Sequence, residues 1–125
     1  MVVRSSSVKV TIETLDQTTI VNAEGRLDFS AAAGFQQQVQ QALAGAGKAP
    51  AALIVDCSGL EYVSSAGLRV FLLGARSAQR SGQAFMVCSL RQAVREVFDL
   101  SGFSRMMAVH PDRATALAQL SARPS

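Results

Sequence analysis

Strand-like and helix-like segments alternate along this chain, and that alternation limits the possible folds more than any other feature of the sequence. Residues 51–55 are continuously apolar and bounded by turn residues, as in a strand that is covered on both faces. Helical periodicity follows over 65–80, and a second buried strand is expected over 83–88. Strands that alternate with helices form parallel sheets joined by right-handed crossovers. We therefore expect an α/β fold with a mixed, mostly parallel sheet of about five strands and about four helices.

The first third of the chain predicts a β-hairpin followed by a helix. Apolar and polar residues alternate over 8–15, and a second β-rich stretch covers 18–24 after a short turn at 16–17. The stretch 25–28 is expected to form a loop, after which Ser30 can cap a helix. The apolar stripe of that helix consists of Ala32, Phe35, Val39, Ala42, Leu43 and Ala46.

The middle of the chain contains two connecting segments and one further helix start. Residues 45–50 predict a linker that ends the first helix. Residues 56–64 predict a loop between the buried strand and the helix over 65–80. Ser89 and Gln92 have the spacing of a capping box, so we expect the third helix to begin there.

The C-terminal segments complete the order ββαβαβαβα. Residues 105–109 predict the last strand, and Pro111 is expected to lie in the first turn of the final helix. With 125 residues the chain has no room for a second sizeable core. We therefore expect one domain over residues 8–120, with loose ends at 1–7 and 121–125.

The composition argues against several functional classes. The net charge is +3, but the basic residues are scattered, and the chain has six Phe, one Tyr and no Trp, so we expect no nucleic-acid binding. No apolar run approaches the roughly 18 residues of a membrane span. The first residues do not resemble a signal peptide, so we expect a cytoplasmic protein without a membrane partner. Cys57 and Cys88 are expected to be buried apolar residues, and no metal-ligand cluster or cofactor motif is present in the sequence.

The segment after the first buried strand is the most informative for function. Asp56 ends the strand, and the next helix begins at Ser64 or Ser65. Ligands and partners tend to bind where the carboxyl end of a parallel strand meets a helix N-terminus. The free N–H groups and the positive end of the helix dipole favour an anion there. A phosphate on a serine hydroxyl would fit this position, and Gly67 leaves room for another surface to approach.

Two short motifs resemble a known family. The first is Asp-Cys-Ser at residues 56–58 followed by Tyr-Val-Ser-Ser-Ala-Gly-Leu at residues 62–68, and the second is Gly-Arg-Leu-Asp at residues 25–28. Together they resemble the signature of the STAS family, in particular the bacterial anti-sigma factor antagonists. The resemblance covers nearly the whole chain, since the order and spacing of the predicted elements agree with it.

The resemblance implies a partner-switching regulator rather than an enzyme. Such a protein binds an anti-sigma factor that is a serine kinase of the histidine-kinase-like ATPase fold. It is released when the kinase phosphorylates it, and a PP2C-type phosphatase restores the bare serine. The acceptor position of the family falls on Ser65. Well-known antagonists have Asp before the acceptor where this chain has Ser64, so Ser64 is a second, less favoured acceptor. The implied partner-binding residues are Asp28, Ser58, Ser64, Ser65, Ala66, Gly67 and Arg69.

Structural roles compete with these functional ones. Ser65 can be an N-cap only, and Asp28 can be a turn residue of its loop. Asp56 and Ser58 are expected to hold their loop through local backbone hydrogen bonds. Tyr62 is expected to pack against the helix.

Two other functions compete with partner switching. A Ser-His hydrolase is disfavoured because His110, the only histidine, is distant in sequence and Ser65 lies outside a GxSxG motif. A STAS subunit that senses a ligand, or that acts as a scaffold in a signalling or secretion-regulating assembly without a sigma factor client, remains open.

Overall fold

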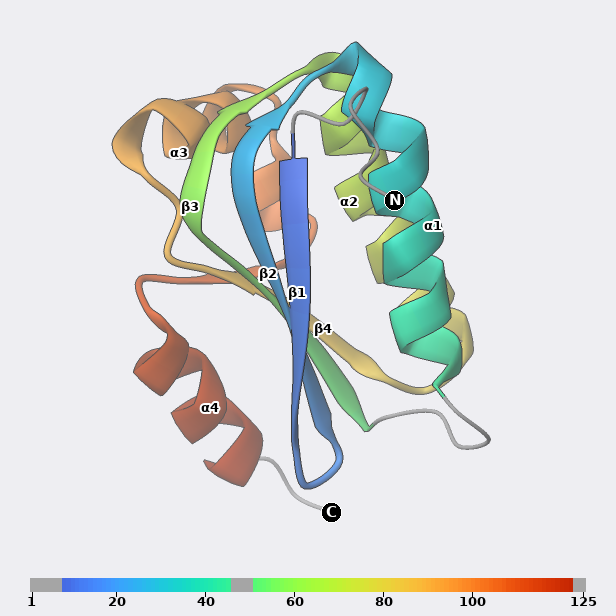
Figure 1. Ribbon diagram of the computed structural model, residues 1–125. Coiled ribbons are helices and arrows are strands. Elements are labelled where there is room, and N and C mark those ends of the chain that lie inside the picture. Colours follow the sequence, from blue (N-terminus) through green and yellow to red (C-terminus); the bar gives the residue numbers. More distant parts are fainter. Residues whose placement is uncertain (1–7, 46–50, 123–125) are drawn as a thin grey trace.

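A five-stranded sheet forms the centre of the structure, a computed structural model that describes residues 8–45 and 51–122 (Figure 1). The strands follow one another in space in sequence order, β1-β2-β3-β4-β5. The first two strands are antiparallel, and every later pair is parallel. The prediction of a mixed, mostly parallel sheet is thus confirmed. The strands are β1 (Val8–Leu15), β2 (Thr18–Leu27), β3 (Ala52–Val63), β4 (Ala84–Cys88) and β5 (Ala108–His110).

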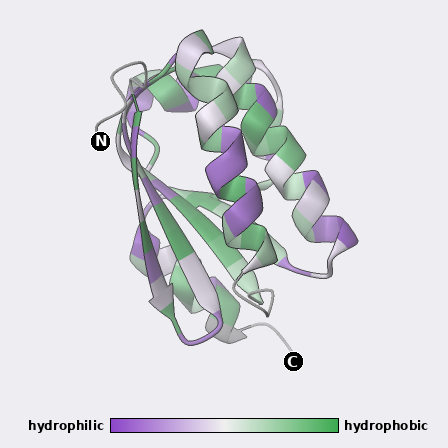
Figure 2. Ribbon diagram, turned by 45° about the vertical axis from the view of Figure 1, so that its right-hand side comes forward, coloured by the Kyte–Doolittle hydropathy of each residue, from purple (hydrophilic) through white to green (hydrophobic). Residues whose placement is uncertain are grey.

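Helices cover both faces of this sheet. The first two helices lie side by side over one face (Figure 2), and the last helix lies on the opposite face. The third helix lies beside the second half of β3, beyond the point where β4 ends. The order of helices and strands agrees with the predicted one. The helices are α1 (Phe29–Ala44), α2 (Ser65–Arg80), α3 (Gln92–Leu100), a 3-10 turn (Phe103–Arg105) and α4 (Arg113–Ala122).

The main core lies between the sheet and the first three helices. Three phenylalanine rings connect these helices: Phe71 of α2 lies 5.7 Å from Phe35 of α1 and 5.2 Å from Phe98 of α3, measured between ring centroids. Tilted and edge-on aromatic pairs of this kind contribute roughly 0.5–1.5 kcal/mol beyond the burial of their area. A smaller core on the other face joins Ile20, Ile54 and the buried Ala116 of α4. Because both faces of β3 are buried here, its first half is a continuously apolar run.

Three helix starts differ from the prediction. Asp28, not Ser30, caps α1, since its carboxylate accepts the N–H of Ala31 at 3.0 Å. The N-cap of α3 is Arg91 and makes no side-chain capping bond, so the predicted capping box at Ser89 is wrong. Ser89 has φ 63°, a left-handed conformation that takes its side chain out of the capping geometry.

The last helix begins later than expected. It starts at Arg113, not at Pro111, and the carboxylate of Asp112 accepts the N–H of Thr115 at 2.7 Å. This bond satisfies one of the free N–H groups of the first turn, which Pro111 has no means of doing. The predicted strand over 105–109 is shifted to Ala108–His110, because a 3-10 turn occupies the residues before it.

Strand β3 is longer than predicted. Residues 56–63 continue the strand instead of forming a loop, because they pair in parallel with β2 up to the Leu27–Val63 pair. The same pairing makes residues 25–27 part of β2, with register shifts after Asn22 and after Gly25. Both strands therefore reach the same end of the sheet.

Some predictions concern residues outside the described part of the chain. These are the loose ends at 1–7 and 123–125, most of the linker 45–50, and the contact of Ala46. Residues 121 and 122, expected to be loose, continue α4.

Candidate functional site

The N-termini of α1 and α2 are held side by side at one end of the sheet (Figure 1). The carbonyl oxygen of Leu27, the last residue of β2, accepts the backbone N–H of Ser64 at 2.9 Å. It also accepts the hydroxyl of Ser64 at 3.0 Å. The two helices begin within two residues of these bonds, at Phe29 and Ser65. Their positive dipole ends therefore meet at one surface.

Ser64 uses its hydroxyl to hold this arrangement together. The hydroxyl donates to Leu27 and accepts the N–H of Gly67 at 3.1 Å, which makes Ser64 the N-cap of α2. The side chain is half-buried. The alternative in which Ser65 is the N-cap is therefore wrong, because the preceding residue occupies that position.

Ser65 is the first residue of α2, and its side chain is exposed. The first turn of the helix contains no acidic residue that would neutralise the positive dipole end. Arg69 lies one turn further along and is also exposed. Since residues four apart share one face of a helix, its guanidinium can reach a group attached to Ser65. The surface around Ser65 therefore suits an anion.

Gly67 packs against β2. It is buried, and a Cβ atom on it would lie 2.7 Å from Cγ of Leu27 and 3.0 Å from the carbonyl oxygen of that residue. The prediction that Gly67 leaves room for another surface is wrong, because Leu27 of the protein itself occupies the space beside it. Ala66, the neighbouring residue, is half-buried and packs against the main core.

Asp28 joins the same surface from α1. As the N-cap it accepts bonds from Ala31 N–H and, at 2.8 Å, from the hydroxyl of Ser30. Next to it, Phe29 is 82% exposed, which is unusual for a phenylalanine. This exposed ring was not predicted from the sequence, because the helical stripe begins only at residue 32. A phenylalanine outside the stripe was the available signal.

A second aromatic residue is also exposed near the end of β3. Tyr62 is 40% exposed, and the guanidinium carbon of Arg26 lies 4.4 Å from its ring centroid. This is a cation–π contact between neighbouring strands. The expected packing of Tyr62 against the helix is wrong, because the pairing of Arg26 with Tyr62 across β2 and β3 places the two side chains on each other.

Asp56 is built into the opposite side of the sheet. Its side chain is buried at 5% exposure, and it accepts the N–H of Ser58 at 3.0 Å. This confirms the expected local hydrogen bond. Its other oxygen accepts from Nε of Arg113 at 3.0 Å, an ion pair that connects β3 to the start of α4.

The Arg113 side chain extends this network to the first two strands. It donates to Asn22 at 2.6 Å and forms an ion pair with Glu13 at 3.2 Å. Asn22 in turn donates to Glu13 at 2.7 Å. The hydrogen bonds from Asn22 and Arg113, together with the charge of Arg113, lower the pKa of Glu13. This network was not visible in the sequence, because its members lie up to 100 residues apart.

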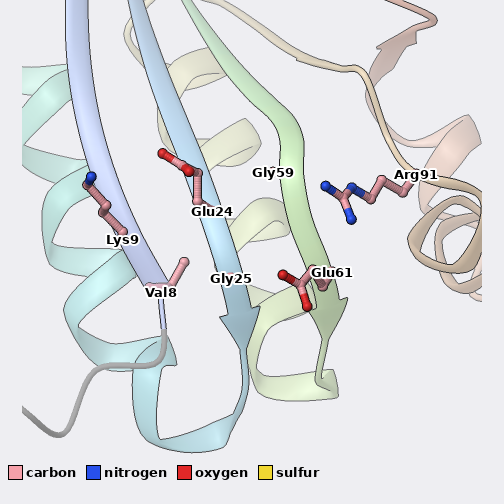
Figure 3. A pocket seen from close by; sticks show the side chains of 7 residues that line it. All are labelled: Val8, Lys9, Glu24, Gly25, Gly59, Glu61 and Arg91. Atoms are coloured by element: carbon pink, nitrogen blue, oxygen red, sulfur yellow. The ribbon is translucent and has the colours of Figure 1, made fainter.

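Ser58 lies at the exposed side of β3, next to a shallow hollow. Its carbonyl oxygen accepts from Nε of Arg91 at 2.8 Å. The hollow has a volume of about 420 Å³ and lies over the ends of the first three strands (Figure 3). Its lining is mostly polar and charged, unlike the largely apolar lining of small-molecule pockets. It is lined by Val8, Lys9, Glu24, Gly25, Gly59, Glu61 and Arg91.

The two cysteines are buried in the sheet, as expected. Burial raises the pKa of the Cys57 thiol well above its usual range, so the reactive thiolate is disfavoured. Among the described residues, no group of His, Cys, Asp and Glu is arranged to hold a metal ion. In the same part of the chain, no hydrogen bond joins His110 to Ser65. None of the described helices is long and apolar enough to cross a membrane.

A sequence model described as "Mlab, STAS domain" matches residues 10–109. The chain therefore belongs to the STAS domain family, as the two motifs indicated. Among its relatives is BtrV of Bordetella bronchiseptica, provisionally named an anti-sigma factor antagonist. It is 33% identical over 110 residues, which cover 88% of this chain and 92% of BtrV.

Solved structures show the same fold. The crystal structure of an anti-sigma factor antagonist from Mycobacterium paratuberculosis has a TM-score of 0.81 at 23% identity, covering 95% of this chain and 97% of that one. SpoIIAA, an anti-sigma factor antagonist, has a TM-score of 0.77 in its unphosphorylated form at 19% identity, covering 94% of this chain and 100% of that one. Its phosphorylated Bacillus form has a TM-score of 0.68 at 18% identity, covering 90% of this chain and 99% of that one.

Proposed function

We propose that this protein is an anti-sigma factor antagonist that binds an anti-sigma factor serine kinase and is released when Ser65 is phosphorylated. The observation that carries the proposal is the contrast between two adjacent hydroxyls. The hydroxyl of Ser64 is engaged in two hydrogen bonds, whereas the side chain of Ser65 is exposed at the helix start. The names of BtrV and SpoIIAA support the same function, and SpoIIAA has been solved both with and without phosphate.

A phosphate on Ser65 is compatible with the folded domain. It adds roughly −1.5 to −2 charges near pH 7. At a helix N-terminus such charge stabilises the fold by roughly 0.3–1 kcal/mol. The exposed Arg69 can pair with the phosphate oxygens from the next turn. Release of the partner therefore needs no unfolding and no change of conformation.

The effect of the phosphate falls on the docked partner. A kinase surface that fits a serine hydroxyl has to desolvate a bulky anion instead. An unpaired buried charge costs several kcal/mol, and each 1.4 kcal/mol is a tenfold loss of affinity. The charge alone is thus sufficient to eject the kinase, and a PP2C-type phosphatase would restore binding.

The proposed docking surface surrounds Ser65. Asp28, Ser64, Ala66 and Arg69 lie at the two helix starts. Ser58, also expected to bind the partner, lies apart from them in β3, beside Asp56. Gly67 contributes indirectly, because it is buried and allows the helix to lie against Leu27. Partner interfaces are commonly anchored by aromatic side chains. We add two exposed rings, Phe29 and Tyr62, as anchors for the kinase.

The direct test is phosphorylation by a purified anti-sigma factor kinase from the same organism, with ATP, followed by peptide mass spectrometry. We expect one phosphate on Ser65, none on the Ser65→Ala variant, and continued modification of a Ser64→Ala variant. Modification of Ser64 instead, or of neither serine by any such kinase of the organism, would contradict the proposal.

A binding experiment separates the charge from the bulk of the phosphate. Ser65→Asp introduces a negative charge, and Ser65→Asn is its neutral control of the same size. We expect the Asp variant to lose at least about a hundredfold in kinase affinity and the Asn variant to lose much less, as measured by titration calorimetry. Equal losses in the two variants would show that the charge is not the cause.

A further inference from the structure

β1 is the first strand of the sheet and pairs with β2 in an unbroken register from Val8 to Leu15. Among the residues that the structure describes, no strand pairs with the outer edge of β1 over residues 9–15. The opposite edge strand, β5, has only three residues. Exposed edge strands are usually protected by charged side chains, proline or bulges, because their free N–H and C=O groups pair readily with another strand. β1 contains neither a proline nor a bulge, and its two charged residues, Lys9 and Glu13, are of opposite sign.

The side chains of β1 are self-complementary. Along one face of the strand, Lys9 precedes Thr11 by two residues and Glu13 follows it by two. An antiparallel copy of the strand, related by a two-fold axis at Thr11, places Lys9 opposite Glu13 of the second copy, twice. The same symmetry places Val10 opposite Ile12 of the second copy on the other face.

Other two-fold registers do not match the charges. An axis at Lys9 or at Glu13 places like charges opposite each other, which is destabilising. An axis at Ile12 places Lys9 opposite Leu15. The pairing centred on Thr11 is therefore the register that the charges of β1 favour.

The charges that flank β1 extend the complementarity. Within one copy, Lys9 lies opposite Glu24 in the β1–β2 register, and Glu13 is bound to Arg113. Joining two copies at Thr11 produces a row of alternating charge across the junction: Glu24 and Lys9 of one copy, then Glu13 and Arg113 of the other. Lys9 is exposed and makes no ion pair within the described part of the chain.

The helix beside this edge is also unusual for a solvated surface. α1 contains no charged residue in its sixteen positions. Together with Val8 and Val10 of β1, its outer side lines a groove of about 440 Å³. Depletion of charged side chains is a property of interface cores rather than of free surfaces. The helix residues that line the groove are Gly34, Phe35, Gln37, Gln38 and Gln41.

Apolar side chains are exposed along the same edge. Ile12 is 50% exposed and Leu15 is 47% exposed. In the paired arrangement Ile12 packs against Val10 of the second copy. The two α1 helices, which lie over the same face of their sheets (Figures 1 and 2), then flank the junction.

We propose that β1 binds β1 of a second copy of this chain, antiparallel about Thr11, so that two five-stranded sheets join into one continuous sheet in a symmetric dimer. The contact is isologous, as in most homodimers. Ser65 lies on α2, which packs against β3 and β4 and not at the β1 edge, so Ser65 stays accessible in both copies. The dimer does not depend on the proposed function, and either can fail without the other.

The first test is the oligomeric state of the full chain by sedimentation equilibrium at concentrations up to about 100 μM, where a specific but moderate self-association is detected. We expect a dimer for the wild type. Lys9→Glu replaces two attractive pairs by two repulsive ones and should raise the dissociation constant about tenfold. Arg76→Glu makes the same charge change on the exposed side of α2 and should leave the constant unchanged. A monomeric wild type, or equal behaviour of the two variants, overturns the proposal.

The second test concerns the register. Directly opposite residues of antiparallel strands have Cα atoms about 4.5 or 5.5 Å apart, and both distances suit a disulfide. A Thr11→Cys variant should therefore cross-link to itself under mild oxidation. A Gln79→Cys variant, exposed at the far end of α2, is the control. The native Cys57 and Cys88 are buried and should not interfere. Cross-linking of Thr11→Cys no faster than the control overturns the register.

Discussion

Asp56 and Ser65 belong to the same sequence motif, only nine residues apart, but the structure gives them opposite surroundings. The Asp56 carboxylate is buried and bound to Ser58 and to Arg113, so it fastens β3 to α4. The side chain of Ser65 is exposed at a helix start. One end of the motif therefore maintains the fold, and the other end is available for chemistry. Substitutions of Asp56 should therefore change the stability of the fold, whereas substitutions of Ser65 should change the modification of the protein.

The largest effect is expected at Asp56. Asp56→Ala removes the acceptor for the N–H of Ser58 and leaves Arg113 without its most buried partner. Because Arg113 is itself one-third exposed, at 33%, it can recover some hydration, and we expect a loss of about 2–3 kcal/mol in the free energy of unfolding. Urea denaturation measures it. Asp56→Asn keeps an acceptor and should lose less stability. A loss below about 0.5 kcal/mol for Asp56→Ala would show that the hydrogen bonds and ion pair of Asp56 do not stabilise the fold.

A smaller effect is expected at Gly67, which lies two residues after Ser65 in α2. In Gly67→Ala the new methyl group would lie 2.7 Å from Cγ of Leu27, so either the strand or the helix has to shift. We expect a loss of about 1–3 kcal/mol by urea denaturation, together with weaker kinase binding. Gly34→Ala is the matched control, since no atom lies within 4 Å of its new Cβ. It should stabilise α1 by roughly 0.5–1 kcal/mol. If both variants were equally stable, the tight contact at Gly67 would not matter.

The two adjacent serines provide a finer test. Ser64→Ala removes an N-cap and the hydrogen bond to Leu27, so it should cost about 1 kcal/mol of stability. Ser65→Ala is exposed and should change stability by less than about 0.5 kcal/mol. Thermal unfolding of both variants side by side measures the difference. If Ser65→Ala were less stable than Ser64→Ala, Ser64 would not be the residue that caps α2.

The smallest effect is expected at Glu13, the exposed acidic residue that binds Arg113 and Asn22. Asn22 and Arg113 lower the pKa of Glu13 because they bind its charged form. The resulting stabilisation is present above the unfolded-state pKa of about 4.3 and is lost as the pH falls through the lower folded-state value. Glu13→Gln should therefore lose slightly less stability than the wild type between about pH 5 and pH 3. Melting temperatures over this range measure the difference. If the melting temperatures of the wild type and of Glu13→Gln fell equally with pH, the pKa of Glu13 would be the same in the folded and the unfolded state.

Much of the fold was predictable because it is encoded locally. The hairpin, the α2 helix over 65–80 and the order of elements follow from periods of two and 3.6 residues, which neighbouring residues determine. The motif around Ser65 was likewise readable, since its spacing lies within one strand and one helix start. The boundary at Ser30 was not, because more than one polar residue near that helix start can serve as the cap. The boundary at Ser89 was not, because its left-handed backbone conformation does not follow from the local pattern.

The sequence by itself determined the types of the elements, their order and the position of the two serines at a helix start. The tertiary structure decided which of those hydroxyls is occupied, since the acceptor is the carbonyl of Leu27, 37 residues away. It also decided that residues 56–63 form a strand, because only pairing with β2 makes them one. Similarly, the partner of Asp56 is 57 residues further along. Local patterns specify periodicity, whereas contacts between distant residues depend on the path of the whole chain.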